Sequence, residues 1–157
     1  MDRAAFAVEQ WARERPDLRT LPMAIFGRLS EAAERVMREH MNPLFAKAGL
    51  QAGEFDVLAT LRRSGKPYTL SPTQLYEAAM ISSGGMTDRL DRLERAGLVV
   101  RRPDPKDRRG KLIVLTDPGK RLIDEAIGRH VANEERLLTQ AEQETLDALL
   151  KKLIAGL

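Results

Sequence analysis

The order of structural signals between Ser71 and Thr116 constrains the fold of this chain more than any other feature. The segment Ser71-Pro72-Thr73-Gln74 predicts a helix start, because serine suits the N-cap, proline the first helical position, and glutamine can complete a capping box. A second helix is expected to begin at Ser82-Ser83-Gly84-Gly85 and to end before Gly97. Two strand patterns follow, joined by the polar stretch PDPKDRRG, which is too long for a tight hairpin and too polar to be buried. This order is that of a winged helix-turn-helix.

Positive charge is concentrated in the same region. Between Ser82 and Lys111 nine basic residues stand against five acidic ones, a balance of +4, whereas the whole chain carries +3, so the remainder sums to −1. A basic segment on an otherwise nearly neutral chain is what a nucleic-acid-binding surface requires. A solvated charged face is the alternative interpretation of the same residues.

Composition excludes several other classes of function. The chain has no cysteine, so disulfides, thiolate metal sites and thiol-based oxidant sensing are excluded. His40 and His130 lie far apart without a metal-binding spacing, and the nucleophile and phosphate-loop motifs of common enzymes are missing. We therefore expect no catalytic residue, no metal and no cofactor. The absence of a long apolar run or a secretory signal predicts a cytoplasmic protein without a membrane span.

Helical patterns flank the central region on both sides. We expect a mainly α fold with a small β-hairpin, divided into N-terminal helices (1–49), a winged helix-turn-helix domain (50–118) and C-terminal helices (119–157). Within the N-terminal helices, a long helix is expected to begin at Leu21, to be kinked by Pro43 and to end at Gly49. The outer helices are amphipathic and must bury their apolar stripes, either against a second copy of the chain about a twofold axis or by folding back on their own lobe. The first arrangement makes them dimerisation helices.

The second central helix offers chemistry suited to DNA. A helix start presents unpaired N–H groups to a phosphate, and the hydroxyls of Ser82 and Ser83 add donors beside the small Gly84. Thr87 and Arg92, farther along, are expected to reach base edges in a major groove. The complete set of expected DNA contacts is Thr73, Ser82, Ser83, Gly84, Thr87, Arg92, Asp107, Arg108, Arg109 and Lys111.

The combination of SPTQL, GGMTDRLDRLERAGLVVR and DPKDRRGKLIVLT resembles the MarR family of bacterial transcriptional regulators. The resemblance implies a homodimer that binds a double-stranded, pseudo-palindromic DNA operator, with a recognition helix at about Ser83 to Ala96 in the major groove. It also implies that Arg109 enters the adjacent minor groove, oriented by Asp107 through a charge-assisted hydrogen bond. Repression is the expected mode, and the sequence does not fix the operator.

Four residues further resemble the urate-responsive branch of the family: Trp11, Asp56, Arg89 and Arg101. The resemblance implies that they surround a small anionic ligand such as urate. An indole can cover a planar ring, and guanidinium groups can pair with its oxygens. In the empty protein Asp56 would hold Arg89, and a bound anion would draw Arg89 away, so that the recognition helix moves and DNA is released.

Other interpretations stay open at this stage. The ligand of such a regulator can be another organic or phenolic acid, for example trans-aconitate. The four residues can equally be structural, with Trp11 as an anchor, Asp56 and Arg89 as an ion pair, and Arg101 on a phosphate. A small-molecule-binding protein without DNA binding is disfavoured by the basic wing, and an enzyme using Asp56 by the lack of a second carboxylate, metal set or nucleophile.

Overall fold

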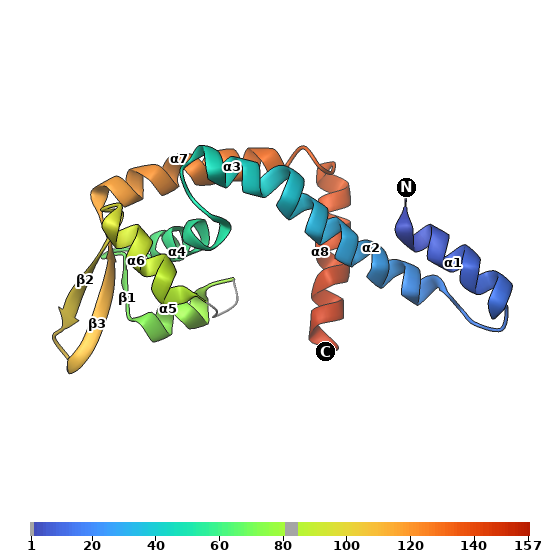
Figure 1. The fold of residues 1–157 in the computed structure, drawn as a ribbon, viewed down its shortest axis with the longest axis horizontal. Coiled ribbons are helices and arrows are strands. Elements are labelled where there is room, and N and C mark those ends of the chain that lie inside the picture. The colour runs from blue at the N-terminus through green and yellow to red at the C-terminus, as the bar shows by residue number, and fades with distance from the viewer. Residues whose placement is uncertain (1, 81–84) are drawn as a thin grey trace. The chain divides into compact units, whose positions relative to one another are not determined.

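The computed structural model describes residues 2–80 and 85–157, and the chain forms two compact units, residues 1–43 and 44–157. Each unit is described by itself below, and its elements can be followed in Figure 1. The expected three-part division into 1–49, 50–118 and 119–157 concerns function and stays a prediction.

The first unit is a helical hairpin. Helix α1 (Arg3–Glu14) packs on α2 (Leu21–Arg35), with Ala4 buried between them. Asp2 joins the two helices, because its carboxylate accepts a hydrogen bond from the Ala5 backbone N–H at 3.0 Å and pairs with Arg28 on α2 at 2.8 Å. The backbone hydrogen bond, followed by Arg28, lowers the pKa of Asp2.

The disturbance expected at Pro43 takes the form of a π-helical turn. Residues Val36–Met41 form this turn (η1), in which the Asn42 N–H donates to the Met37 carbonyl, and α3 (Asn42–Lys47) follows directly. Proline has no N–H to donate to the carbonyl four residues before it, so the regular ladder cannot run through this position. A π-type bond one turn earlier accommodates the interruption, and α3 then ends at Lys47, followed by a turn in which the φ of Gly49 is +72°.

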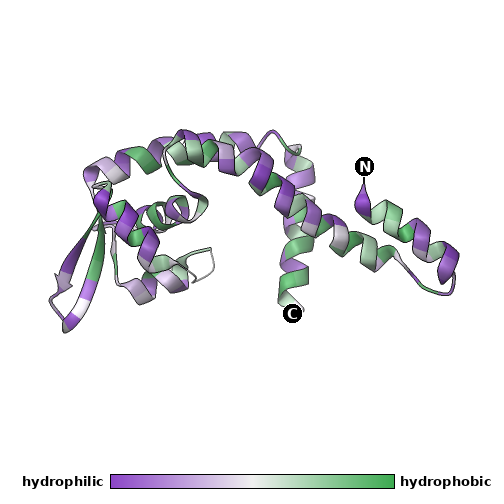
Figure 2. Cartoon of the chain, viewed as in Figure 1, coloured by the Kyte–Doolittle hydropathy of each residue, from purple (hydrophilic) through white to green (hydrophobic). Residues whose placement is uncertain are grey.

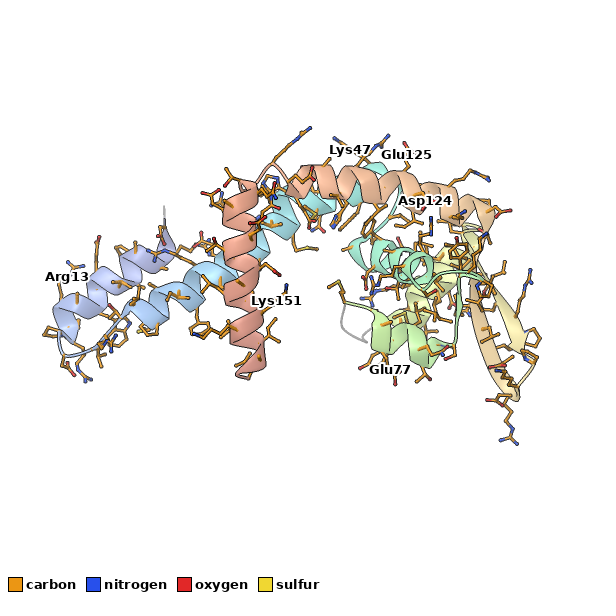
Figure 3. All side chains as sticks on the ribbon, turned by 180° about the vertical axis from the view of Figure 1, so that it is seen from behind. Arg13, Lys47, Glu77, Asp124, Glu125 and Lys151 are labelled. Atoms are coloured by element: carbon orange, nitrogen blue, oxygen red, sulfur yellow. The ribbon has the colours of Figure 1, made fainter. Side chains whose placement is uncertain are left out.

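The second unit is built around α4 (Ala52–Arg63). Its inner residues Val57, Leu58 and Leu61 are fully buried, and α5 (Pro72–Ala78), α6 (Met86–Arg95) and α7 (Asp117–Glu134) all pack around this helix. Arg62 on α4 also pairs with Asp124 on α7 at 2.6 Å, and Asp124 is labelled in Figure 3. These contacts make α4 the central helix of the second unit.

The sheet differs from the expected hairpin in two ways. Its strands are β1 (Thr69–Leu70), β2 (Val99–Asp104) and β3 (Asp107–Leu115), antiparallel in the order β1-β3-β2, and β1 was not expected. The expected eight-residue loop is wrong, because the pairing continues to Asp104 opposite Asp107 and leaves only a two-residue turn. An exposed ribbon tolerates polar side chains, and an irregularity at Pro103/Asp104 accommodates the proline that cannot donate to the ladder.

The helix signals were more accurate at cap residues than at boundaries. The reciprocal capping boxes of Ser71 with Gln74 and of Thr139 with Glu142 are confirmed. Helix α6 begins at Met86, with the left-handed Gly85 as its N-cap, which is later than the expected start at Ser82 or Ser83. Helix α7 ends at Glu134 rather than near Leu138. The shift at α7 arises because the hydrophobic pattern continues past the point where backbone geometry ends the helix.

Helix α8 (Gln140–Ala155) has no residue in the buried class. Leu149 and Ile154 are 61% and 69% exposed, and hydrophobic residues of this helix are green in Figure 2. The first unit also exposes large apolar side chains, among them Phe6, Leu21, Ile25 and Phe26. None of the helices in the described residues is both long and apolar enough to cross a bilayer.

Two glycines on α7 give a matched pair of stability predictions. A Cβ at Gly119 would lie 2.1 Å from the Leu98 carbonyl oxygen, whereas a Cβ at Gly128 meets nothing within 4 Å. We expect Gly119→Ala to destabilise the protein by about 1–3 kcal/mol through overpacking. Gly128→Ala should instead stabilise it by about 0.5–1 kcal/mol through helix propensity. Urea unfolding of both variants measures this, and equal effects would contradict the close packing of α7 on the α6–β2 turn.

Candidate nucleic-acid interface

Helix α6 presents one face to the protein and another to solvent. Leu90 and Leu93 are 4% and 1% exposed and pack inward, while Thr87, Asp88 and Arg95 are exposed. These two leucines form the inward, apolar face of α6. Thr87, predicted to read a base edge, lies on the exposed part of the first turn, where a groove would be accessible.

Arg92 is engaged by the protein itself. Its Nε donates to Oε1 of Glu54 at 2.6 Å, and Nη2 donates to Oε1 of Gln51 at 3.2 Å, both on the first turn of α4 or its cap. Glu54 is 6% exposed, so this is a largely buried carboxylate holding an arginine of α6. Arg92 therefore faces α4 in this conformation, and its predicted contact with a base edge would require it to leave these partners.

Arg101 connects the β2–β3 hairpin, the wing of the expected winged helix-turn-helix, to α6. Its guanidinium pairs with Asp91 at 2.6 Å and with Glu94, and its backbone N–H donates to Glu94 at 3.0 Å. The backbone hydrogen bond from Arg101, followed by its side-chain hydrogen bond, lowers the pKa of Glu94. Because the folded pKa lies below the unfolded value, this contact stabilises the protein above about pH 4.5 and is lost as pH falls through the lowered pKa.

The tip of the wing is organised by two aspartates. Asp104 accepts a hydrogen bond from the Lys106 N–H at 2.8 Å, and Asp107 accepts one from the Arg109 backbone N–H at 2.9 Å. Asp107 was expected to hold the Arg109 guanidinium, but the contact in the structure is to the backbone. A Cβ at Gly110 would lie 3.0 Å from the Asp107 carboxylate, so the side chain folds over Gly110 and fixes the turn.

The basic residues of the wing are open to solvent. Arg109 and Lys111 are exposed on β3, and Arg102 is exposed on β2. The side chain of Arg108 is outside the described part of the molecule. The same holds for Ser82, Ser83 and Gly84, whose expected phosphate contacts lie outside the described residues. Thr73 is exposed in the first turn of α5, next to the capping box that begins that helix.

Asp56, the first of the expected ligand residues, is largely buried and binds the chain just ahead of α6. Its side chain is 13% exposed and accepts a hydrogen bond from the Met80 N–H at 2.9 Å, with Arg63 Nη1 at 3.8 Å. Arg63 in turn donates to the carbonyl of Ala78. Asp56 thus restrains Met80, two residues after the end of α5.

Arg89 lies close to the same part of α4. A Cβ built on Gly53 would fall 2.2 Å from the Arg89 Nε, so the arginine occupies the space that a larger residue would fill. Gly53 and Asp56 are three residues apart and share a face of α4. The structure therefore brings Arg89 to the turn of α4 that precedes Asp56.

The other two expected ligand residues are placed differently. Arg101 is held by Asp91 and Glu94, as described above. Trp11 belongs to the first unit, where it is 41% exposed and lines a cavity of about 340 Å³ between α1 and α2. The sequence reasoning missed Glu54, Gln51 and Arg63, although Glu54, three residues after Gln51, is a recognisable capping signal.

The structure offers no metal centre among the described residues, where no three potential metal-ligating side chains gather. His130 instead lies against the rings of Phe45 and Phe55, with centroid distances of 5.9 and 5.0 Å. It also approaches Glu134 at 3.3 Å. His130 is therefore a packing residue of the second unit.

Comparison with known proteins decides the family. Residues 48–110 match the model described as MarR family. The chain is 45% identical to the HTH-type transcriptional regulator PecS of Dickeya dadantii over 93% of this chain and 89% of that protein. It is 31% identical to the multiple antibiotic resistance protein MarR of Escherichia coli over 80% of this chain and 85% of MarR. The chain belongs to the MarR family. It is accordingly a DNA-binding transcriptional regulator with a winged helix-turn-helix fold.

Two solved structures of MarR-type regulators support the same conclusion. The Streptomyces coelicolor regulator Sco3205, solved in complex with DNA, has a TM-score of 0.77 at 25% identity and covers 89% of each chain. BpsR of Bordetella bronchiseptica has a TM-score of 0.65 at 26% identity, covering 80% of this chain and 98% of that one. The BpsR structure concerns regulation of DNA binding by 6-hydroxynicotinic acid.

The exposed Arg109 gives a prediction for the wing. We expect Arg109→Ala to weaken binding to a duplex selected by the wild-type protein about tenfold or more, because a minor-groove arginine and its charge are lost. Arg109→Lys should recover part of this loss, since lysine restores the charge but holds its water more tightly. Fluorescence anisotropy titration measures both affinities, and a thermal melt checks that neither variant unfolds. Unchanged affinity of Arg109→Ala would exclude the wing contact.

Proposed function

We propose that this protein is a homodimeric repressor that binds a pseudo-palindromic operator and leaves it when a small planar anion binds. The observation that carries the DNA-binding part is the basic β2–β3 wing beside the solvent-exposed face of α6. In this proposal α6 enters the major groove through Thr87, and Arg109 enters the neighbouring minor groove. Half-site centres would lie about 10 bp apart.

The homodimer is supported by apolar side chains that each unit exposes. Leu146, Leu149 and Ile154 on α8 are 42%, 61% and 69% exposed, and Leu21 and Phe26 on α2 are 63% and 54% exposed. Stripes of this kind on two terminal segments are unfavourable in water and mark an interaction surface. A second copy of the chain about a twofold axis would cover them and would present two α6 helices to one duplex.

Ligand control is supported by the contacts of Asp56 and Arg89. Asp56 restrains Met80 just before the segment that leads into α6, and Arg89 lies over Gly53 on the preceding turn of α4. An anion that paired with Arg89 and repelled Asp56 would act on both supports of α6 together. The ligand must bind the DNA-incompetent conformation more tightly, and a tenfold loss of DNA affinity corresponds to about 1.4 kcal/mol of coupling.

Urate is the ligand that we propose first, with Arg101 as the second guanidinium. Arg101 would then have to leave Asp91 and Glu94, which would also loosen the wing from α6. An aromatic acid such as the 6-hydroxynicotinic acid of the BpsR structure is the second candidate, because it too combines a planar ring with negative charge. An enzymatic function finds no support in relatives that are transcription regulators.

Titration with urate tests the ligand. We expect it to quench the fluorescence of Trp11, the one tryptophan of the chain, and to release a selected duplex over the same concentration range. Arg89→Ala should weaken quenching, because one guanidinium partner of the anion is removed. The same titration with 6-hydroxynicotinic acid distinguishes the two candidates. Neither quenching nor release by either compound at millimolar concentration would exclude this site.

Analytical ultracentrifugation tests the homodimer. We expect a dimer for the wild-type chain and a shift towards monomer for Leu149→Glu, because the charge would be buried in the interface. Lys152→Glu on the same helix is the control, since it adds the same carboxylate at an already polar, exposed position. A monomeric wild-type chain, or a dimer unaffected by Leu149→Glu, would argue against pairing through α8.

A further inference from the structure

Two successive residues of α4 each receive an arginine from α6. Gly53 leaves the space that the Arg89 side chain occupies, and Glu54 accepts the Nε–H of Arg92 at 2.6 Å. Arg89 and Arg92 are three residues apart and so lie on the same side of α6. The first turn of α4 is therefore a cradle for this side of the recognition helix.

Both carboxylate oxygens of Glu54 accept hydrogen bonds in this cradle. Its Oε2 accepts the Gln51 backbone N–H at 2.8 Å, which closes the capping box of α4, and its Oε1 accepts Arg92. The carboxylate is 8% exposed, and the Arg92 side chain is 38% exposed. A buried carboxylate that caps one helix and holds an arginine of another fixes the second helix relative to the first, because breaking either contact leaves a buried carboxylate oxygen without its hydrogen bond.

We propose that Glu54 is a positioning residue for DNA recognition, and that it acts by keeping Arg92 away from the phosphates. An arginine on the recognition helix that is free to swing outward would bind any phosphate and add affinity without sequence information. Held by Glu54 and Gln51, Arg92 instead fixes the rotation of α6 about its axis and keeps Thr87 on the exposed face. Specificity is thus improved by restraining a cation that could otherwise bind DNA. The proposal rests on α6 being the recognition helix.

The decisive experiment compares Glu54→Gln, Arg92→Gln and the double variant. Each protein is titrated with the duplex that the wild type selects from a random pool and with an unselected duplex, at several salt concentrations. For Glu54→Gln we expect the ratio of the two affinities to fall about tenfold, which is within the discrimination that one base pair supplies. Binding to the unselected duplex should become more salt-dependent, by about 0.9 in the log–log slope for each new phosphate contact.

The double variant separates positioning from simple capping. If Glu54 acts through Arg92, adding Glu54→Gln to Arg92→Gln should change neither the affinity ratio nor the salt slope further. Glu142→Gln is the matched control, since Glu142 closes the capping box of α8 at 2.8 Å from the Thr139 N–H. It should alter neither the affinity ratio nor the salt slope, because glutamine can also close a capping box. Equal effects of Glu54→Gln in both backgrounds, or an unchanged salt slope, would overturn the proposal.

Gly53→Ala tests the other half of the cradle without touching the carboxylate. The new methyl group would displace the flexible Arg89 side chain, so we expect a reduced affinity ratio with little change in the melting temperature. An unchanged ratio would show that Arg89 does not help to orient α6. If the wild-type protein selected no duplex at all, α6 would not be a recognition helix, and that failure is distinct from the failure of Glu54 as a positioning residue.

Discussion

The packing of α6 on α4 is the interaction on which the DNA-reading surface depends. Leu90 and Leu93 supply the apolar contact, and the buried Glu54 holds Arg92 beside them. Apolar packing is non-directional, so it can hold a helix in place without fixing its rotation. The ion pair between Arg92 and Glu54 has a preferred geometry and therefore restrains this rotation. Because the carboxylate also caps α4, it ties α6 to the first turn of that helix.

The wing is joined to the same helix from the other side. Arg101 on β2 pairs with Asp91 and Glu94 on α6, so helix and hairpin are linked by charge as well as by chain connectivity. Pairs this exposed are individually weak. Their importance lies in geometry, since a change at α6 is transmitted to the wing. On the proposed mechanism, a ligand that redirected Arg89 or Arg101 would disturb both α6 and the wing.

Sequence reasoning predicted local features better than tertiary ones. The capping boxes at Ser71 and Thr139 are set by side chains within one turn, so they can be read directly. The wing was predicted as a loop because Pro103 and its charged neighbours are unusual in strands, yet a solvent-exposed ribbon tolerates them. The ion-pair partners of Arg92 and Arg101 could not be predicted from the sequence. Glu54, the partner of Arg92, lies on another helix. The pairing of Arg101 with Asp91 and Glu94 depends on how β2 crosses α6. The roles of the ligand residues remain proposals for the same reason.

Site-directed cleavage of DNA tests the central claim most directly, and the chain has no cysteine to interfere. A cysteine introduced at Asp88 on α6 or at Lys106 on the wing turn can carry an iron chelate that cuts nearby DNA. The account predicts localised cuts by the α6 probe within each half-site and by the wing probe in the flanking minor groove, with no cuts from a probe at Gly128 on α7. Cleavage from Gly128 as strong as from Asp88, or none from Lys106, would contradict it.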